Sequence, residues 1–409
     1  MNVQTTPGTG PTTEELAALE SAIRKAEPAY LADLERLVNI DCGSYTPAGV
    51  DEVGRFVAGF MRELGAEVDV KPDPSGRLGS TIVGTVRGDL VGGPRFLLIG
   101  HMDTVFDPGT AAERPFRVED GVATGPGVTD MKSGLLAGLY ALRELLALGL
   151  RPFEQLVFVA NPDEEIGSPS STPIIREVAA SSDVCLVLEC ARANGDIVSS
   201  RKGILDARIS IRGRAAHAGV EPEKGRSAIL AAADLVQRLH GLNGRWPGVT
   251  VNVGVIGGGS RPNVVPERAS LEVDVRAVRR EDLEAAEAEI GRLLGDLAVP
   301  DATAEIEAMA RWWPMEKLER SGRLVEHATA LAERLGFTVK DTATGGASDA
   351  NTTAGLGMAS LDGLGPIGDN DRSPAEYLDV ESIVPRTTLV AGLLVAIGRD
   401  PLIREWRTG

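Results

Sequence analysis

Short apolar segments alternate with helix-patterned segments through the first half of the chain. Segments 80–88, 95–100, 155–160 and 183–189 are rich in apolar residues and have the length of strands, and the last three are almost continuously apolar. Helical patterns lie at 12–40, 50–66, 133–148 and 172–180. Buried strands separated by helices are typical of a mostly parallel sheet that is covered on both faces, so we predict an α/β fold.

The pattern changes from about Gly203. Segment 204–214 alternates like a half-exposed strand, a helix pattern covers 225–242, and strand patterns follow at 248–258 and 268–278. A helix at 280–298 and a strand at 303–310 complete the order βαββαβ, which is typical of a ferredoxin-like α+β unit. The α/β alternation then resumes, so we expect an α/β domain at 1–202 and 312–409, with a smaller domain inserted at 203–311.

Composition excludes several classes of partner. The 409 residues carry a net charge of −17, and the acids are spread along the chain, which argues against nucleic acid or an anionic membrane as a partner. Three cysteines without a CxxC pair indicate a reducing compartment. The longest apolar stretch, 135–150, is interrupted by Arg143 and Glu144 and is too short to cross a bilayer. The first residues do not resemble a signal peptide, so we expect a cytoplasmic protein.

Three consecutive acids, Asp163, Glu164 and Glu165, follow the apolar segment 155–160. Between Gln155 and Ile175 there is no Lys or Arg that could compensate their charge. A solvated acidic loop is the ordinary interpretation of such a triplet. If the triplet is buried, however, the charges repel one another and require a cation from elsewhere.

Other polar residues also follow strand segments. His101 and Asp103 follow segment 95–100, Glu189 ends segment 183–189, and Asp130 precedes the helix at 133–148. Ligands bind at the carboxyl ends of strands in an open parallel sheet, so we expect these groups to meet the acidic triplet at one edge. A divalent metal would remove the repulsion, and nitrogen together with carboxylate ligands suits zinc.

Five ordered motifs carry a family resemblance: GHMDTV (100–105), GPGVTDMKSG (125–134), DEEIGS (163–168), AAHAG (215–219) and TGGASDA (344–350). Together they resemble the glutamate carboxypeptidase and aminoacylase family of zinc peptidases, which includes acetylornithine deacetylase and succinyl-diaminopimelate desuccinylase. The similarity covers nearly the whole chain. It implies an α/β catalytic domain with an inserted dimerisation or lid domain.

The resemblance also implies roles for the residues at the sheet edge. Asp130 would bridge two zinc ions, often with a cis peptide after it, while His101 and Glu189 would complete one site and Glu165 would belong to the other. Asp103 would orient the imidazole of His101. Glu164 would be the general base that takes a proton from the attacking water. Cobalt or manganese could substitute for zinc.

In the family, the inserted domain pairs two subunits and contacts the substrate. By resemblance, His217 of AAHAG would stabilise the oxyanion across a homodimer. Asn263, Arg276 and the segment containing Gly346 would bind the substrate, and the arginine would suit an α-carboxylate because its planar fork binds carboxylates through two hydrogen bonds.

One departure from the family pattern concerns the second zinc. The family places a histidine shortly before a Glu-Tyr pair near the C-terminus, but segment 365–380 contains no histidine. Counting back from Glu376 and Tyr377 puts Asp371 or Arg372 at that position. Asp371 could bind zinc through oxygen, and we expect it to do so and to preserve two ions per chain. The alternative is that the guanidinium of Arg372 replaces the second ion, which leaves a one-metal site.

These features predict a metallohydrolase that cleaves an amide bond next to a free α-carboxylate. Release of a C-terminal amino acid such as glutamate from a peptide or N-acyl substrate is the favoured activity. The alternatives are an N-acyl-amino acid deacylase and a catalytically weak homologue that acts as a binding or scaffold protein.

Overall fold

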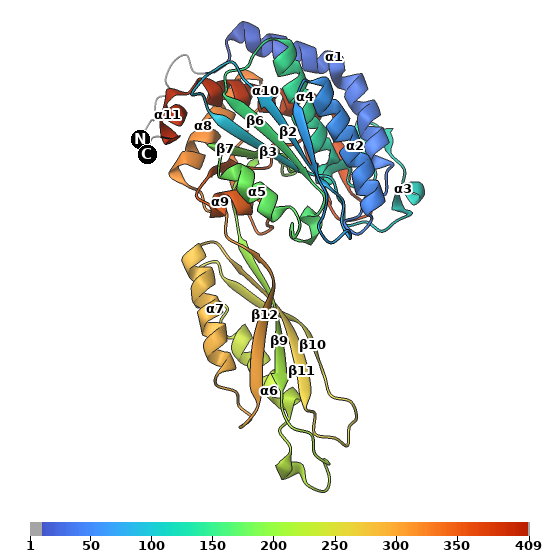
Figure 1. Cartoon of the computed structure of the whole chain (residues 1–409), viewed down its shortest axis with the longest axis vertical. Helices are drawn as coiled ribbons and strands as arrows, with labels where there is room; N and C mark the ends of the chain where they lie inside the picture. Colours follow the sequence, from blue (N-terminus) through green and yellow to red (C-terminus); the bar gives the residue numbers. More distant parts are fainter. Residues whose placement is uncertain (1–9, 408–409) are drawn as a thin grey trace. The chain divides into compact units, whose positions relative to one another are not determined.

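The computed structural model describes residues 10–407, which form two compact units (Figure 1). The first unit comprises the chain up to Ser199, Lys317–Ala343 and the chain from Ser348 onward. The second comprises Ser200–Glu316 and Thr344–Ala347. The N-terminal segment in which we expect no signal peptide falls largely outside the described residues.

A six-stranded sheet forms the centre of the first unit, in the order β1-β2-β6-β3-β7-β14. In that order the strands are β1 (Glu67–Lys71), β2 (Thr81–Arg87), β6 (Gln155–Asn161), β3 (Arg95–His101), β7 (Val184–Val187) and β14 (Ala359–Leu361). Strands β6, β3, β7 and β14 are parallel, whereas β1 and β2 pair antiparallel. The prediction of a mostly parallel sheet is therefore confirmed.

Helices cover this sheet, and the four predicted ones are present. The helices of the first unit are α1 (Thr13–Val38), α2 (Pro47–Glu63), α3 (Thr110–Glu113), α4 (Ser133–Ala147), α5 (Thr172–Ala179), α8 (Glu319–Arg334), α9 (Asp349–Gly355), α10 (Ile383–Arg399) and α11 (Pro401–Arg404). Helix α1 begins with a capping box in which Thr12 and Glu15 satisfy each other's backbone N–H groups. Helices α1, α4 and α10 pack together.

The segment Val380–Arg399, which includes α10, is long and apolar enough to cross a bilayer. The stretch 135–150 is therefore not the strongest such candidate. Because 83% of the apolar window in Val380–Arg399 is buried inside the protein, its composition is that of a core helix.

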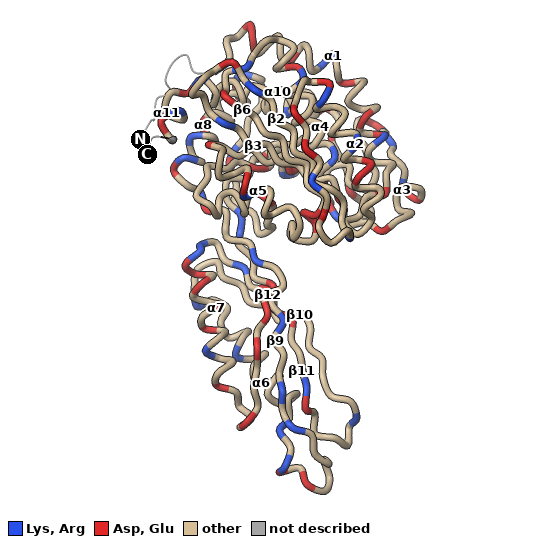
Figure 2. The backbone as a smooth tube through the Cα atoms, in the orientation of Figure 1, with Lys and Arg blue, Asp and Glu red and all other residues tan. Residues whose placement is uncertain are grey.

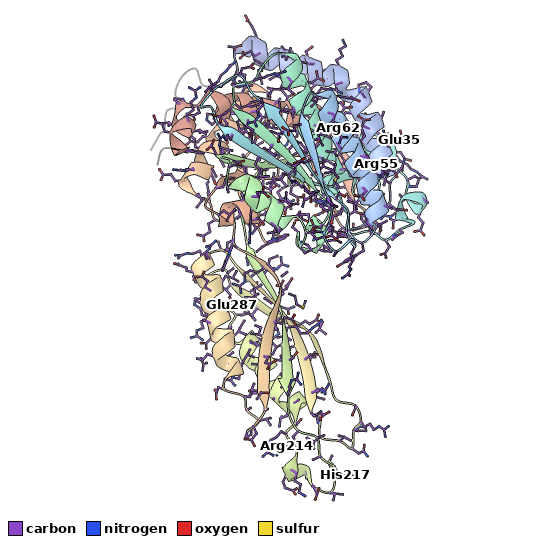
Figure 3. The ribbon with its side chains drawn as sticks, viewed as in Figure 1. Glu35, Arg55, Arg62, Arg214, His217 and Glu287 are labelled. Atoms are coloured by element: carbon purple, nitrogen blue, oxygen red, sulfur yellow. The ribbon has the colours of Figure 1, made fainter. Side chains whose placement is uncertain are left out.

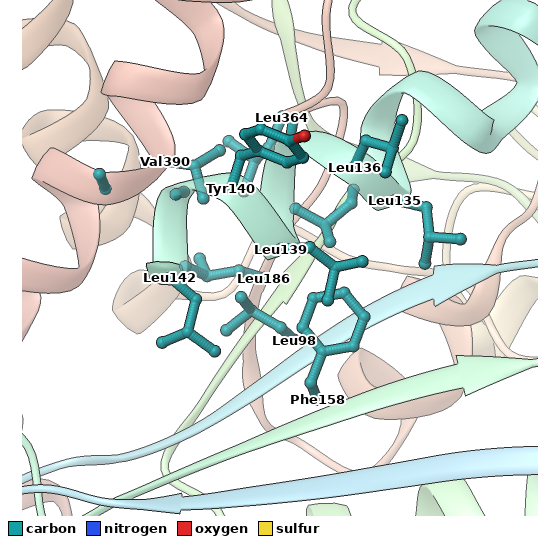
Figure 4. Packing of buried hydrophobic residues seen from close by; sticks show 14 of the residues in the cluster. Leu98, Leu135, Leu136, Leu139, Tyr140, Leu142, Phe158, Leu186, Leu364 and Val390 are labelled. Carbon is teal, nitrogen blue, oxygen red and sulfur yellow. The ribbon is translucent and has the colours of Figure 1, made fainter. Parts of the chain in front are cut away.

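The core lies between α4 and the sheet (Figure 4). Leu139 of α4 lies near Leu98 of β3 and Phe158 of β6, and all three side chains are almost fully buried. Leu186 of β7 and Leu142 of α4 extend the same layer. The continuous apolar pattern of the central strands thus reflects burial on both faces of the sheet.

Two small sheets complete the strand pairing. One has the order β15-β16-β5-β4, with β15 (Gly368–Asp369), β16 (Tyr377–Asp379), β5 (Val122–Thr124) and β4 (Arg117–Glu119). The other pairs β8 (Ile197–Arg201) with β13 (Asp341–Thr344). The first of these sheets joins the chain before α4 to the C-terminal segment that contains Glu376.

The second unit has the predicted βαββαβ order. Its elements are β9 (Gly203–Arg212), α6 (Ala228–His240), β10 (Thr250–Gly258), β11 (Arg268–Ala277), α7 (Arg280–Leu294) and β12 (Thr303–Trp312). The sheet order is β10-β11-β9-β12 with antiparallel pairing throughout, which is the ferredoxin-like arrangement. Alternate residues of β9, from Leu205 to Ile211, are buried, as the sequence pattern predicts.

Charged residues of both signs are interspersed over each unit (Figure 2). Many form local ion pairs, such as Arg311 with Glu287 and Arg208 with Glu272 in the second unit.

The burial of α4 leads to a prediction about stability. Leu139→Ala should lower the free energy of unfolding by about 2–5 kcal/mol, because it removes buried methyl groups and leaves a cavity. Leu148→Ala, at an exposed position just after the same helix, should change it by less than about 0.5 kcal/mol. Chemical denaturation followed by circular dichroism measures both, and equal midpoints for the two variants would contradict the described packing.

Candidate metal centre

The strand ends of the first unit bring the predicted polar groups together. His101 is the last residue of β3, Glu164 lies in the short turn η2 (Glu164–Ile166) after β6, and Glu189 follows β7. Asp130 lies in η1 (Val128–Lys132), directly before α4. His101 is 1% exposed, Glu164 3%, Asp130 5% and Glu189 8%, so the acids are buried and the interpretation as a solvated loop is wrong for Glu164.

The side-chain atoms are close enough to share a cation. His101 Nε2 lies 3.1 Å from Asp130 Oδ1 and 3.6 Å from Glu189 Oε1. Among residues 10–407, two groups have their potential ligand atoms within 4.8 Å of one another: His101 with Asp130 and Glu165, and His101 with Glu164 and Glu189. Two ligands bound about 2.1 Å from a tetrahedral zinc lie about 3.4 Å apart, so the spacing fits a zinc ion.

Asp103 holds several parts of this site in place. Its carboxylate accepts the hydroxyl proton of Ser44 (2.6 Å) and the backbone N–H groups of Glu164 (3.1 Å) and Glu165 (3.2 Å). His101 Nδ1 lies 3.0 Å from the carbonyl oxygen of Asp103 and 3.3 Å from its Oδ1. These acceptors orient the imidazole, and Nε2 consequently faces Asp130 and Glu189.

Glu376 holds the backbone around Asp130. Its carboxylate accepts the backbone N–H groups of Gly127 (3.0 Å), Thr129 (2.9 Å) and Asp130 (3.1 Å), and its side chain is almost fully buried. The peptide bond between Asp130 and Met131 is cis, as the resemblance implies. Burial raises the pKa of Glu376 to about 7, although the three N–H groups oppose this shift.

The pKa values of the site show how strongly the acids repel one another. Burial and the neighbouring Glu189 carboxylate raise the pKa of Glu164 well above its usual value. Burial and Asp130 raise the pKa of Glu165 to about 9. Burial lowers the pKa of His101, but its hydrogen bonds with Asp103 and Asp130 outweigh burial and raise it well above its usual value. A cation is therefore needed to keep these carboxylates ionised together.

Arg372 supplies one cation. Its Nη2 lies 2.7 Å from Glu165 Oε2 and 3.8 Å from Glu164 Oε2, and its Nε lies 3.5 Å from Asp130 Oδ2. Burial disfavours the charged guanidinium, but the carboxylates of Glu165 and Asp130 raise the pKa of Arg372 above its usual value. The side chain remains 53% exposed, so one side of this ion-pair cluster is open to solvent.

Asp371 is the residue that the sequence analysis expects to bind a second ion through oxygen. Among residues 10–407, it is in neither group of potential ligands. It lines a cavity of about 340 Å³ with Cys190, Arg192 and Asn194, among others. The next residue, Arg372, has a φ of 63°, and its guanidinium pairs with the acids of the cluster.

The predicted substrate-binding residues lie in the second unit. Arg276 on β11 pairs with Asp274 (3.1 Å) and donates a hydrogen bond to the carbonyl of Gly345 (2.8 Å), next to Gly346. At the other end of β11, the backbone carbonyl oxygen of Asn263 accepts a hydrogen bond from the backbone N–H of Ala218 (3.1 Å). Segment 214–226, which contains the short turn η3 (Pro222–Lys224), and segment 259–267 lie at that end.

His217 belongs to the same loop region as Asn263. Figure 3 shows it, with Arg214, in the loops at one end of the sheet of the second unit. His217 forms an isolated bridge with Val264, and its Nδ1 accepts the backbone N–H of Gly219 (3.2 Å).

Two supporting residues were missed from the sequence. Ser44 lies in a loop without a distinctive motif, so nothing in the sequence indicates its contact with Asp103. The supporting role of Glu376 was also not predicted, because its burial directly before β16 becomes visible only when that strand pairs with β5.

Known proteins of similar sequence identify the family of this chain. Residues 97–396 match Peptidase family M20/M25/M40. The chain belongs to this family. It is 33% identical over 384 residues to carboxypeptidase G2 of Pseudomonas sp. (strain RS-16), covering 93% of this chain and 92% of that protein. It is 26% identical over 392 residues to acetylornithine deacetylase of Edwardsiella ictaluri (strain 93-146), covering 90% and 97%, respectively.

Solved structures agree on the fold. Aminopeptidase PepT of Bacillus cereus superimposes with a TM-score of 0.75 at 24% identity, covering 91% of this chain and 98% of that one. The M20 family metallo-carboxypeptidase Sso-CP2 of Sulfolobus solfataricus gives a TM-score of 0.73 at 16% identity, covering 90% and 99%. The family membership identifies this protein as a metal-dependent hydrolase.

The position of Glu376 leads to a second prediction. Glu376→Gln should weaken zinc binding about 10- to 100-fold, because an amide presents only one acceptor atom to the three N–H groups that fix Asp130. Glu381→Gln, at an exposed position nearby, is the matched control and should bind zinc like the wild type. Calorimetric titration of the metal-free proteins with zinc measures the difference, and equal affinities would remove Glu376 from the account of the site.

Proposed function

We propose that this protein is a zinc carboxypeptidase that releases a C-terminal amino acid, such as glutamate, from a peptide or N-acyl substrate. The observation that carries the proposal is the buried cluster in which His101 Nε2 faces Asp130 and Glu189 at ligand spacing. The 33% identity to a relative named carboxypeptidase G2 supports the choice of reaction.

Zinc suits the donor set, because one imidazole nitrogen and carboxylate oxygens are among its usual ligands. We propose that His101, Asp130 and Glu189 hold it, and cobalt or manganese could occupy the same donors. When bound, the ion would polarise the scissile carbonyl and lower the pKa of water. His101 Nε2 would have to be unprotonated to act as a ligand.

Glu164 is our proposed general base. Its carboxylate is buried beside His101 and Glu189, and its backbone N–H is fixed by Asp103. From this position it would take the proton of the attacking water and transfer it to the nitrogen of the leaving amine, which completes cleavage of the amide bond.

A homodimer is proposed because the candidate substrate residues are far apart within one chain. Arg268 and Arg276 lie near opposite ends of β11. At about 3.3 Å per residue, Arg276 is therefore roughly 26 Å from Arg268, where the Asn263 loop joins the strand. A small substrate cannot span this distance. We therefore propose that His217 and Asn263 act on the substrate bound by the partner subunit, while Arg276 and Gly346 serve their own chain.

Exposed apolar side chains support self-association. Val255 and Ile256 on the edge strand β10, and Ile229 and Leu230 on α6, are all exposed in the second unit. An edge strand with apolar side chains is suited to pairing with a second copy.

We also propose a cytoplasmic location, since the three cysteines are free and buried. We propose neither a nucleic acid nor a membrane as a partner.

The second candidate is deacylation of an N-acyl amino acid, which the similarity to acetylornithine deacetylase favours. A panel of N-acyl amino acids that varies the amino acid and the acyl group independently separates the two. A carboxypeptidase discriminates mainly by the released amino acid, whereas a deacylase discriminates mainly by the acyl group. No turnover of any member, with metal bound, would leave the binding or scaffold role.

The role of Glu164 leads to a third prediction. Glu164→Gln should retain zinc but lower kcat about 10²–10⁴-fold, because the amide cannot accept the proton of water. Glu177→Gln, at an exposed position on α5, should keep wild-type turnover. Elemental analysis and steady-state kinetics on the same samples provide the two readouts, and near-normal turnover by Glu164→Gln would exclude it as the base.

The shared site leads to a fourth prediction. His217→Ala and Glu164→Gln homodimers should each be nearly inactive, whereas mixing them should restore activity, because a hybrid dimer contains one site with both groups intact. Subunit exchange is verified with differently tagged chains, and two batches of His217→Ala mixed together serve as the control. Exchange without recovered activity would count against a site built from two subunits.

A further inference from the structure

We propose that the guanidinium of Arg372 occupies the place of a second metal ion, so that this chain binds one catalytic ion where a two-metal site would bind two. The inference rests on the proposed function, because it concerns the same carboxylates. The positive charge required by the acidic cluster is then divided between an exchangeable ion and a fixed side chain.

The two oxygens of Asp130 face different partners. Oδ1 lies 3.1 Å from His101 Nε2, whereas Oδ2 lies 3.5 Å from Arg372 Nε. A carboxylate that bridges two metal ions directs one oxygen to each ion. Here the side of Asp130 that would face a second ion faces the guanidinium instead.

Glu165 is engaged in the same way. Its Oε2 lies 2.7 Å from Arg372 Nη2, so the two opposite charges are in direct contact, and the Glu165 side chain is only 2% exposed. An ion bound by Asp130 and Glu165 would have to displace the guanidinium or lie directly beside its positive charge. Mutual repulsion of the two cations therefore opposes a second ion at this position.

Arg372 cannot itself become a metal ligand. A guanidinium has no free lone pair and does not lose its proton in proteins, unlike the imidazole found at this position in the family. The backbone around this side chain also has an unusual conformation: Asn370 and Arg372 have φ values of 57° and 63°, in the left-handed region. Non-glycine residues adopt that region only where their surroundings stabilise it, and the contacts with Asp130 and Glu165 provide such stabilisation.

The first ion site remains complete under this assignment. His101 Nε2 lies close to Asp130 Oδ1 and to Glu189 Oε1, whereas Arg372 contacts the other oxygen of Asp130. Single zinc ions activate water in many hydrolases, so hydrolysis does not require the second ion. Glu165 then serves as the ion-pair partner that holds Arg372, and not as a ligand.

Metal stoichiometry tests the inference on the full-length protein. Wild type, Arg372→His, Arg372→Lys, Asp371→Ala and Arg192→His are saturated with zinc, freed of excess ion and analysed for zinc per chain. We expect one ion in the wild type, two in Arg372→His, and one in the other three. Arg192→His controls for a histidine added at the neighbouring cavity, and Asp371→Ala controls for loss of the adjacent carboxylate.

Three results would overturn the inference: two ions in the wild type, with or without a fall to one in Asp371→Ala; no bound ion in the wild type; or one ion in a folded Arg372→His protein. If circular dichroism shows that Arg372→His does not fold, the wild type and Arg372→Lys decide, since both keep the cation and must hold one ion. Hydrolysis of the substrate panel by the same samples is scored separately. One ion without hydrolysis would refute the proposed carboxypeptidase activity and leave the role of Arg372 intact. Two ions with hydrolysis would refute the role of Arg372 and leave the activity intact.

Discussion

Repulsion among buried carboxylates is the constraint on which this site depends. Asp130, Glu164, Glu165 and Glu189 meet at the carboxyl edge of the parallel sheet with little access to water. Removing charges from water costs several kcal/mol per ion unless opposite charge and hydrogen bonds replace the lost solvation. The raised pKa values of Glu164 and Glu165 express this cost. The arrangement is therefore favourable only with cations, and we assign these to a divalent metal and Arg372.

The fold supplies the rigidity that such a cluster needs. Two further buried acids, Asp103 and Glu376, face backbone N–H groups instead of the metal position, and they fix the turns that carry Glu164 and Asp130. Their hydrogen bonds join segments far apart in the sequence, because Glu376 lies 246 residues from Asp130. Strand ends alone bring the ligands to one edge of the sheet, whereas these acids set their directions.

Much of this could be predicted from the sequence, because apolar runs and strand ends are local patterns. The sheet, the βαββαβ order, and the convergence of His101 with the acids follow from such patterns. The choice between Asp371 and Arg372 does not, since the two residues are adjacent and only the three-dimensional structure shows that the Arg372 guanidinium pairs with Asp130 and Glu165. Likewise, the separation of Asn263 from Arg276 depends on the length and register of β11, which no single motif encodes.

The most direct test of the central claim is anomalous diffraction from zinc-loaded crystals, with data collected above and below the zinc absorption edge. We predict a single peak per chain, within bonding distance of His101 Nε2, Asp130 Oδ1 and Glu189, and the Arg372 guanidinium between Asp130 and Glu165. A structure with no zinc at His101, or with Arg372 turned to solvent and a second zinc in its place, would contradict the account.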